Sequence, residues 1–253
     1  MPETTHLYHA AVAGALPLDG ILIPAKRLLY RGLFRGDYLR YLAFRARVAA
    51  GACRLGIYER ETIRAVKGLV APGDVTVDVG ANFGVYAMTL AGLVGPSGQV
   101  HAFEPQTAVF DLLRERLSGT PQVTVVRSAV AAVPGVGRIV VPDIAGDVPE
   151  PSLGSLRRDA TAGSRGDEVP VTTLDAYCGA FDRLAFVKVD AEGGDLDVLV
   201  GGRKTLERLR PVVQVECNDE RLLSEFAAFA DEIGYDLDVR AYSRVNRMLI
   251  PRR

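Results

Sequence analysis

The stretch Val75-Thr-Val-Asp-Val-Gly-Ala-Asn-Phe-Gly84 decides the fold class of this chain of 253 residues. Its first half, Val75 to Val79, is a β-branched run of the kind that forms a buried strand. Gly80 and Gly84 then bracket a turn that leads into an apolar helical pattern over residues 85–94. A buried strand followed by a glycine turn and a helix indicates the first βα unit of a parallel sheet.

Outward from this unit, short β-branched runs keep alternating with helical periodicity, which predicts repeated βα units. Further strands are predicted at residues 100–103, 123–126, 138–141, 169–174, 185–189, 212–215, 237–240 and 247–250. Helices are predicted at residues 85–94, 109–117, from about 195, and 219–233. The last two strands are expected to pair as a hairpin. The fold class is therefore α/β, with a Rossmann-like, largely parallel sheet.

The alternation lapses between Asp143 and Glu168, a polar stretch that carries four glycines and two prolines. Long irregular insertions inside compact domains carry a function more often than not. We therefore favour a lid over the active site as the role of this insertion, residues 143–168. The alternative is a surface loop without a role.

The region ahead of the sheet has a different character. We expect residues 1–57 to form a helical N-terminal extension and residues 58–253 to form the main domain. Between Pro24 and Arg54 the chain carries eight basic residues and one acid, Asp37. The simpler interpretation is a cationic helix face packed against the domain, with arginine stems covering apolar surface. The alternative is a docking surface for an anionic substrate or, through weak peripheral contact, for a membrane.

Composition narrows the class of protein. The formal net charge is -1, so no global field draws the chain to nucleic acid, and no nucleic-acid partner is expected. The sequence contains no run of about 18 or more apolar residues, so no transmembrane helix is expected. Cys53, Cys178 and Cys217 lie far apart and form no CxxC pair, which favours reduced thiols in a cytoplasmic protein.

The turn between Gly80 and Gly84 can approach a ligand closely, because glycine has no Cβ. It is not the dinucleotide fingerprint GxGxxG, because Asn82 stands where the second glycine would be. Asp78 at the strand end disfavours a pyrophosphate and suits a cationic ligand such as S-adenosylmethionine, which carries an ammonium and a sulfonium group. A nicotinamide-dependent oxidoreductase is therefore the weaker alternative.

The second strand ends in Phe103-Glu-Pro105, where Glu104, with Pro105 beside it, can accept hydrogen bonds from both hydroxyls of a ribose. One βα unit after the glycine turn, this carboxylate favours an adenosine ligand. The third strand is followed by Ser128 and Ala129, where a hydroxyl and backbone groups could meet the adenine edge.

The fourth strand, within Phe186-Val-Lys-Val-Asp-Ala-Glu-Gly193, places Lys188 and Asp190 on one face of a strand that should be buried. A buried lysine needs a partner, which Asp190, Glu192 or Glu216 could supply. These carboxylates fall at the carboxyl ends of parallel strands, where open α/β sheets bind ligands. At least one is therefore expected in the active site. Together they could hold Mg²⁺ through oxygen ligands, although no metal is expected.

Taken together, these motifs resemble the signature of FkbM-type methyltransferases. The segments that carry the resemblance are Val77-Asp-Val-Gly-Ala-Asn-Phe-Gly84, Phe103-Glu-Pro105, Val171-Thr-Thr-Leu-Asp175, Lys188-Val-Asp-Ala-Glu-Gly193 and Pro211-Val-Val-Gln-Val-Glu216. The resemblance implies a seven-stranded class I methyltransferase sheet whose last strand is antiparallel, with S-adenosylmethionine at its carboxyl edge. One departure is Asp195, where the family usually has a glutamate.

The resemblance also implies roles for individual residues. Those implied to bind the cofactor are Asp78, Gly80, Asn82, Gly84 and Glu104. Asp190 and Glu192 would flank the reacting centre, where one of them is expected to act as general base, and we expect Lys188 to tune their charge. The implied activity is O-methylation of a hydroxyl on a sugar, natural product or other small molecule. A non-catalytic adenosyl-binding protein is a further alternative, and nucleic-acid methylation lacks a supporting motif.

Overall fold

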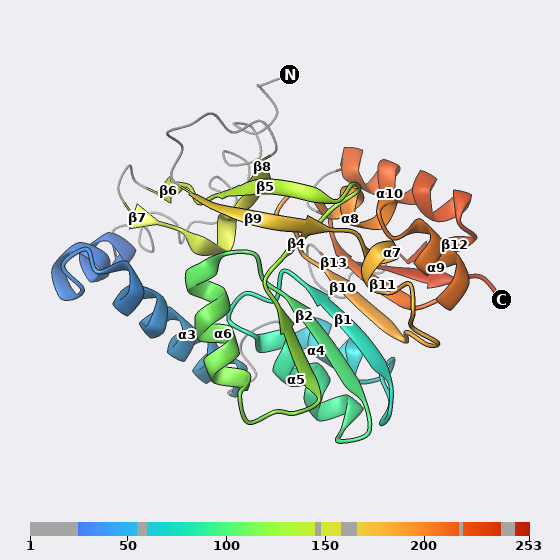
Figure 1. Cartoon of the computed structure of the whole chain (residues 1–253), viewed down its shortest axis with the longest axis horizontal. Helices are drawn as coiled ribbons and strands as arrows, with labels where there is room; N and C mark the ends of the chain where they lie inside the picture. The colour runs from blue at the N-terminus through green and yellow to red at the C-terminus, as the bar shows by residue number, and fades with distance from the viewer. Residues whose placement is uncertain (1–24, 55–59, 145–147, 158–165, 218–219, 239–245) are drawn as a thin grey trace.

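The computed structural model describes residues 25–54, 60–144, 148–157, 166–217, 220–238 and 246–253, and a large twisted sheet is its central feature (Figure 1). Among these residues, seven strands form the sheet in the spatial order β3-β2-β1-β10-β11-β13-β12. Their bounds are β1 Val75–Val79, β2 Gln99–Phe103, β3 Val123–Val126, β10 Phe186–Val189, β11 Val212–Glu216, β12 Tyr235–Asp238 and β13 Asn246–Pro251. Strand β13 runs antiparallel to both of its neighbours, and the other neighbouring pairs are parallel.

This strand order confirms the Rossmann-like, seven-stranded α/β sheet expected from the sequence, including the antiparallel last strand and the pairing of β12 with β13. The direction in which strands are added to the sheet reverses between β1 and β10. In open α/β sheets, such a switch point opens a crevice for ligands at the carboxyl ends of the strands. The glycine turn after β1 and the end of β10 therefore meet where a ligand site is expected.

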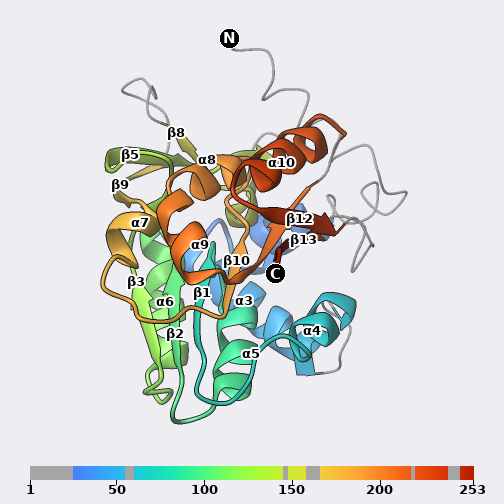
Figure 2. The same ribbon diagram turned by 90° about the vertical axis from the view of Figure 1, so that its right-hand side faces the viewer.

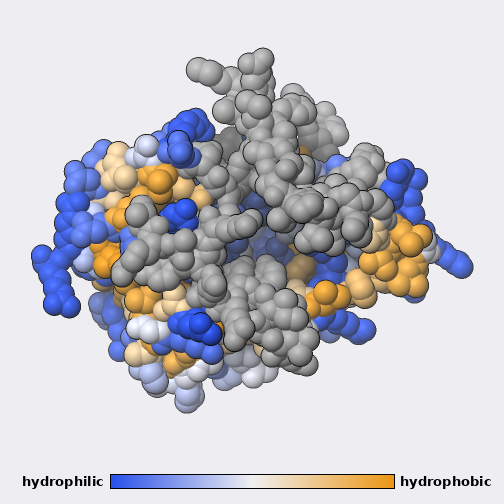
Figure 3. Space-filling view, turned by 180° about the vertical axis from the view of Figure 1, so that it is seen from behind, coloured by the Kyte–Doolittle hydropathy of each residue, from blue (hydrophilic) through white to orange (hydrophobic). Residues whose placement is uncertain are grey.

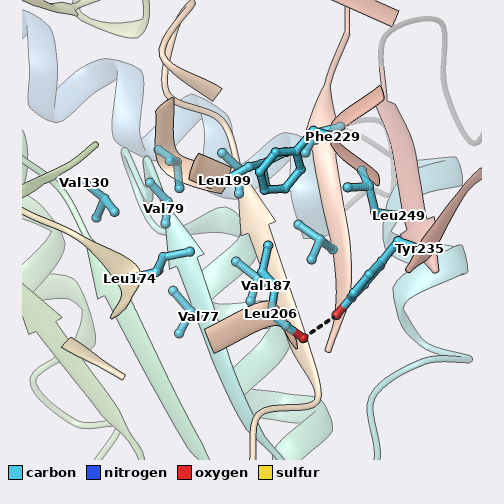
Figure 4. Close-up of a cluster of buried hydrophobic side chains, with 14 of the residues drawn as sticks. Val77, Val79, Val130, Leu174, Val187, Leu199, Leu206, Phe229, Tyr235 and Leu249 are labelled. Atoms are coloured by element: carbon cyan, nitrogen blue, oxygen red, sulfur yellow. Dashed lines mark hydrogen bonds between the residues drawn. The ribbon is translucent and has the colours of Figure 1, made fainter. Parts of the chain in front are cut away.

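Helices cover both faces of the sheet (Figures 1 and 2). Their bounds are α4 Arg60–Val66, α5 Val85–Val94, α6 Thr107–Leu117, α7 Leu174–Tyr177, α8 Asp195–Val200, α9 Arg203–Leu209 and α10 Glu220–Glu232. Helices α4, α5 and α6 share one core with the sheet, and helices α7 to α10 share the other. Val77 and Val79 of β1 project into the second core (Figure 4), at whose edge the Tyr235 hydroxyl donates to the Leu206 carbonyl at 3.1 Å.

Most predicted strands of the main sheet match their observed bounds to within one residue; the strand predicted at 237–240 is observed at Tyr235–Asp238, and residues 239–240 lie outside the described residues. Two other predictions are corrected. Leu174 was expected to end a strand but begins helix α7, because the Thr173 side chain accepts a hydrogen bond from the Ala176 N–H and caps the helix. The single helix expected from about residue 195 is two helices, α8 and α9. Gly201 and Gly202 separate them.

A second, smaller sheet lies beside the carboxyl ends of β2 and β3 (Figure 1). Within the described ranges it has the strand order β4-β9-β5-β8. The bounds in this region are β4 Ala129–Val130, β5 Gly135–Val140, β6 Asp143–Ile144, β7 Val148–Pro149, the 3₁₀ helix η2 Pro151–Leu153, β8 Ser155–Arg157 and β9 Gly166–Thr172. The insertion predicted at residues 143–168 thus contributes β8 and the start of β9 to a sheet. Residues 145–147 and 158–165 lie outside the described residues.

The chain ahead of the main domain is helical where it is described. It contains the π-type helix η1 Leu28–Leu33 and helix α3 Tyr38–Arg54, which packs against α5 and α6. Leu28, Leu33 and Leu39 are largely exposed, and Figure 3 shows hydrophobic residues gathered on the side of the molecule that carries these helices. Membrane contact by this surface stays a prediction. In the part of the chain that the structure describes, no helix is both long and apolar enough to span a membrane.

Replacing Gly80 by alanine should destabilise the fold by roughly 2–4 kcal/mol. The turn holds Gly80 at φ 74°, and an added Cβ would collide with the carbonyl oxygen of Asp190 at the end of β10. Urea unfolding followed by circular dichroism measures the change. The control is Gly92→Ala on α5, where nothing lies within 4 Å of an added Cβ, so stability should stay the same or rise. Equal stability of the Gly80→Ala and wild-type proteins would contradict this account.

Candidate active site

The turn after β1 is built from left-handed backbone conformations. Gly80, Asn82 and Gly84 have φ values of 74°, 48° and 79°. The Gly80 N–H donates to the Phe103 carbonyl at 3.1 Å, so the turn is pinned to the end of β2. Gly84 caps α5, and an added Cβ there would lie 2.5 Å from the Leu113 side chain of α6. The turn residues predicted from the sequence are therefore together, with their backbone presented at the carboxyl edge of the sheet.

Glu104, at the end of β2, faces this turn. Its two carboxylate oxygens accept hydrogen bonds from the backbone N–H groups of Asn82 and Gln106, both at 2.9 Å. The residue is buried, and this burial raises the pKa of Glu104 to about 7 although both N–H groups favour its charged form. Each oxygen keeps a lone pair for a further donor. This geometry is compatible with the predicted contact to two ribose hydroxyls.

The ammonium group of Lys188, on β10, lies at the centre of the site. Its Nζ lies 3.3 Å from Asp78 Oδ1 and 3.2 Å from Asp190 Oδ2, and it donates a hydrogen bond to the Gly80 carbonyl at 3.1 Å. It also lies 5.0 Å from the ring centroid of Tyr86 on α5, within range of a cation–π contact. Since Lys188 is only 5% exposed, one buried cation ties β1, its turn, α5 and β10 together.

Asp78 is a partner of Lys188 that was not predicted from the sequence. The parallel register of β1 and β10 sets Asp78 directly beside Lys188. Asp78 is 0% exposed, so burial raises its pKa while Lys188 pulls that pKa down. The expected direct contact of Asp78 with a cationic ligand is therefore not what this structure offers. The Asp78 carboxylate meets Lys188, and its effect on a ligand would pass through Lys188 and the turn.

Three carboxylates gather at the ends of β10 and β11. Oxygens of Asp190, Glu192 and Glu216 all lie within 4.8 Å of one another. Glu192 has φ 46°, and its burial, reinforced by Asp190 and Glu216, raises its pKa to about 9, so Glu192 holds a proton at neutral pH. The three oxygens would fit one divalent cation, and a proton on Glu192 relieves the same repulsion without one. The expectation that the site needs no metal stays a prediction.

Two acidic residues, Asp175 and Asp195, lie at helix ends. Asp195 lies in the first turn of α8, where it receives the Ala191 N–H at 3.5 Å, and burial raises its pKa to about 7. Asp175 accepts the backbone N–H groups of Lys204 and Thr205 at 3.2 and 2.7 Å, which caps α9 from outside. These side chains support the fold around the site.

Ser128 and Ala129 follow β3 at the same edge as Glu104, and both are buried. The Ser128 hydroxyl lies 2.8 Å from the Ala129 carbonyl and 3.0 Å from the Pro170 carbonyl, to which it can donate. Because this hydroxyl can donate to these carbonyls, an adenine edge would meet backbone groups here. The hydroxyl itself would reach adenine only if it turned away from the carbonyls. Pro105 is half-buried beside Glu104. The predicted adenine contacts stay predictions.

The described parts of the insertion lie beside the end of β2, where the cofactor is expected to bind. Asp167 in β9 accepts the Thr107 N–H at 2.8 Å, at the start of α6. Gly154 packs so closely on Gln106 that an added Cβ would lie 2.7 Å from its side-chain amide. These segments therefore rest on the residues that follow Glu104. A lid over the active site would have to lie beside these residues.

Glu150 joins the insertion to the N-terminal helices, and it was not predicted from the sequence. Its carboxylate pairs with Lys26 at 2.6 Å and with Arg45, and accepts a hydrogen bond from Ser152 at 2.6 Å. Burial alone would raise the pKa of Glu150, but the two cations and Ser152 hold it below its ordinary value. Lys26 and Arg45 thus pack against the domain, as the simpler interpretation of the basic region expects.

A cavity of about 510 Å³ lies between the N-terminal helices and the glycine turn. Lys188, Asp190 and the turn form one wall, and Phe44 and Val48 of α3 belong to the opposite wall. Cavities of roughly 300–1,000 Å³ commonly bind small molecules. Lys188 and Asp190 were predicted from the sequence. The α3 wall was not, because its residues read as one face of an ordinary amphipathic helix.

Residues 78–242 match the family described as the methyltransferase FkbM domain. No curated protein matches the chain. A methyltransferase FkbM from Methylobacillus flagellatus KT is 16% identical, with a TM-score of 0.49, and the match covers 74% of this chain and 50% of that chain. This chain therefore spans about half the length of that protein.

Two further solved structures are similar in fold. Fibrillarin from Aeropyrum pernix, in complex with natively bound S-adenosyl-L-methionine, is 10% identical with a TM-score of 0.45, covering 74% of this chain and 72% of that chain. An S-adenosylmethionine-dependent O-methyltransferase from Thermotoga maritima is 15% identical with a TM-score of 0.41, covering 76% of this chain and 65% of that chain.

Replacing Lys188 by methionine should lower the free energy of unfolding by roughly 3–5 kcal/mol, because Asp78 would be left buried without its cation. Urea unfolding measures the loss. Adding Asp78→Asn to the Lys188→Met protein should recover part of it, since the uncompensated charge is then gone. Lys204→Met, at an exposed position on α9, is the control and should change stability by no more than about 0.5 kcal/mol. If Lys188→Met and Lys204→Met lowered the free energy of unfolding by similar amounts, the central role of Lys188 would be refuted.

Proposed function

The chain belongs to the methyltransferase FkbM domain family, and we propose that it transfers the methyl group of S-adenosylmethionine to a hydroxyl of a small molecule. The observation that carries the proposal is one side chain, Asp190, which lies both against Lys188 at the glycine turn and on the wall of the 510 Å³ cavity. Asp190 can accept a proton, and it would lie between the edge of the sheet that binds the cofactor and the cavity that holds the methyl acceptor.

The residues at this edge fit S-adenosylmethionine. Glu104 keeps lone pairs for two ribose hydroxyls, and the turn at Gly80 exposes backbone without a Cβ in the way. The cluster of Asp190, Glu192 and Glu216 favours a positively charged ligand. When bound, the cofactor supplies an electrophilic methyl group on a cationic sulfur. A nicotinamide dinucleotide fits less well, because its pyrophosphate would face these carboxylates.

Asp190 is the residue that we assign as general base. As the acceptor oxygen bonds to the methyl carbon and the carbon–sulfur bond breaks, the hydroxyl proton must leave. The Asp190 side chain is 33% exposed, borders the cavity and is held by Lys188. Glu192 is less suited to this role, because its pKa of about 9 means that it already holds a proton at neutral pH.

We also propose that the insertion at residues 143–168 closes the site as a lid. Its described parts contact Gln106 and Thr107 at the cofactor edge and reach the N-terminal helices through Glu150. A segment in this position borders both the cofactor edge and the cavity. Methyl transfer depends chiefly on alignment and on exclusion of water, which a closed lid would provide.

Asp190→Asn should lower turnover about a hundredfold or more, because an amide cannot take the hydroxyl proton. Affinity for S-adenosylmethionine should stay within a few-fold of wild type. Formation of S-adenosylhomocysteine, with an acceptor that supports wild-type turnover, measures the first quantity, and titration calorimetry measures the second. Asp197→Asn, an exposed carboxylate of α8, is the matched control and should change neither. Near-normal turnover of the Asp190→Asn protein would contradict the assignment of Asp190 as general base.

Affinity for S-adenosylhomocysteine should rise with pH up to about 7 and level off above it. The Glu104 carboxylate, whose pKa is about 7, can accept two ribose hydroxyls only after it has released its proton. Below that pH, proton release opposes binding, by at most about tenfold per pH unit. Calorimetry from pH 5.5 to 8.5 measures the dependence. In Glu104→Gln the affinity should be at least about tenfold weaker and nearly flat with pH. An equal pH dependence in both proteins would show that another group is responsible.

A further inference from the structure

We propose that the methyl acceptor is a neutral, largely apolar alcohol or phenol, held in the 510 Å³ cavity between α3 and the glycine turn. This inference rests on the proposed methyl transfer and narrows its substrate class. It excludes polyhydroxylated sugars, which the family resemblance alone leaves open. Its basis is the position of the cavity, the chemistry of its walls and its charge balance.

The cavity shares the glycine turn with the edge that fits the adenosine and extends from it towards α3. Its walls include the turn residues Gly80 and Asn82 together with Lys188 and Asp190, but neither Glu104 nor Ser128. A cofactor whose ribose contacts Glu104 would therefore reach the cavity only with its reactive end, across the glycine turn. The part of the cavity that faces α3 is left for the acceptor.

Apart from Arg45, which pairs with Glu150, the α3 side of the cavity is lined mainly by apolar side chains. Tyr41, Phe44, Val48 and Ala49 border it there, and Leu29 of η1 extends the same wall. A sugar buried against this wall would lose water from several hydroxyls, and the wall would offer them only the Tyr41 hydroxyl and the Arg45 side chain that Glu150 already binds. An alcohol or phenol with one hydroxyl needs a single polar contact, and Asp190 offers it on the opposite wall.

The charges around the cavity balance. Lys26 and Arg45 border it as cations, and both pair with Glu150, which leaves this group with a net formal charge of +1. Lys188 pairs with Asp78 and Asp190, which leaves that group at -1. The two groups cancel. An anionic acceptor would have to compete with the buried Glu150 for both of its cations, so a neutral acceptor fits better.

Binding of three probe molecules to the full chain tests the proposal. 4-Phenylphenol is neutral and apolar, methyl α-D-glucopyranoside is polyhydroxylated, and 4-hydroxybenzoate carries a negative charge. Calorimetry with and without saturating S-adenosylhomocysteine gives the dissociation constants, and S-adenosylhomocysteine formation gives methyl transfer. We expect 4-phenylphenol to bind at least about tenfold more tightly than either comparator and to be methylated. Equal or tighter binding of the glucoside or of the benzoate would overturn the proposal, as would failure of 4-phenylphenol to bind.

Variants of the α3 wall place the probe in the cavity. Val48→Glu sets a charge on the wall at a position that is 54% exposed, so the chain can fold normally. Phe44→Ala removes an aromatic part of the same wall. Each should weaken 4-phenylphenol binding about tenfold and leave the affinity for S-adenosylhomocysteine within about twofold. Leu39→Glu, on the same helix but outside the wall and 62% exposed, is the control and should change neither.

These measurements separate the two proposals. If S-adenosylhomocysteine fails to bind the wild-type protein, the proposed function fails, and probe binding without it still decides what the cavity accepts. If S-adenosylhomocysteine binds but the wall variants bind 4-phenylphenol as wild type does, the cavity is not the acceptor site. If the wall variants weaken S-adenosylhomocysteine instead of the probe, the cavity belongs to the cofactor, and the inference is wrong.

Discussion

The arrangement of the site depends on one buried ammonium group. Lys188 is 5% exposed, and its Nζ lies between the carboxylates of Asp78 and Asp190 and against the Gly80 carbonyl. A charge in such surroundings is tolerated only while its partners stay in place. The register of β1 beside β10 places Asp78 next to Lys188, and the contacts of Lys188 then hold the glycine turn and the direction of Asp190. The sheet thus carries a polar centre at its switch point.

From this centre the edge of the sheet divides into two parts. On the β2 side, the turn and Glu104 present backbone and a buried carboxylate to an adenosine-like ligand. On the α3 side, Lys188 and Asp190 open onto a cavity whose far wall is mainly apolar. Glu150, in the insertion, links to this wall, because it pairs with Lys26 and with Arg45 of α3. The N-terminal helices therefore form one wall of this cavity.

The main sheet could be predicted from the sequence because β1, β3, β10 and β11 are short runs rich in valine that alternate with helical patterns, a local signal that burial reinforces. In the second sheet, the strands predicted at residues 138–141 and 169–174 fall on β5 and β9, but β8 and the pairing of these strands were not predicted, because β8 and β9 carry charged residues and pair with β5 through their backbones. The site shows the same division. Motif residues such as Glu104, Lys188 and Asp190 can be predicted from their residue types and their positions within or after the predicted strands. The pairing of Lys188 with Asp78 follows from strand register, and that of Glu150 with Arg45 spans distant parts of the chain.

Thermal unfolding with S-adenosylhomocysteine and, separately, with NAD tests the central claim most directly. A ligand at a hundred times its dissociation constant adds about 2.7 kcal/mol, which raises the midpoint by several degrees. The account predicts that S-adenosylhomocysteine raises the midpoint of the wild-type protein and NAD does not. It also predicts that Glu104→Ala loses the shift, whereas Glu115→Ala, at an exposed position on α6, keeps it. Stabilisation by NAD, or an undiminished shift in Glu104→Ala, would contradict the account.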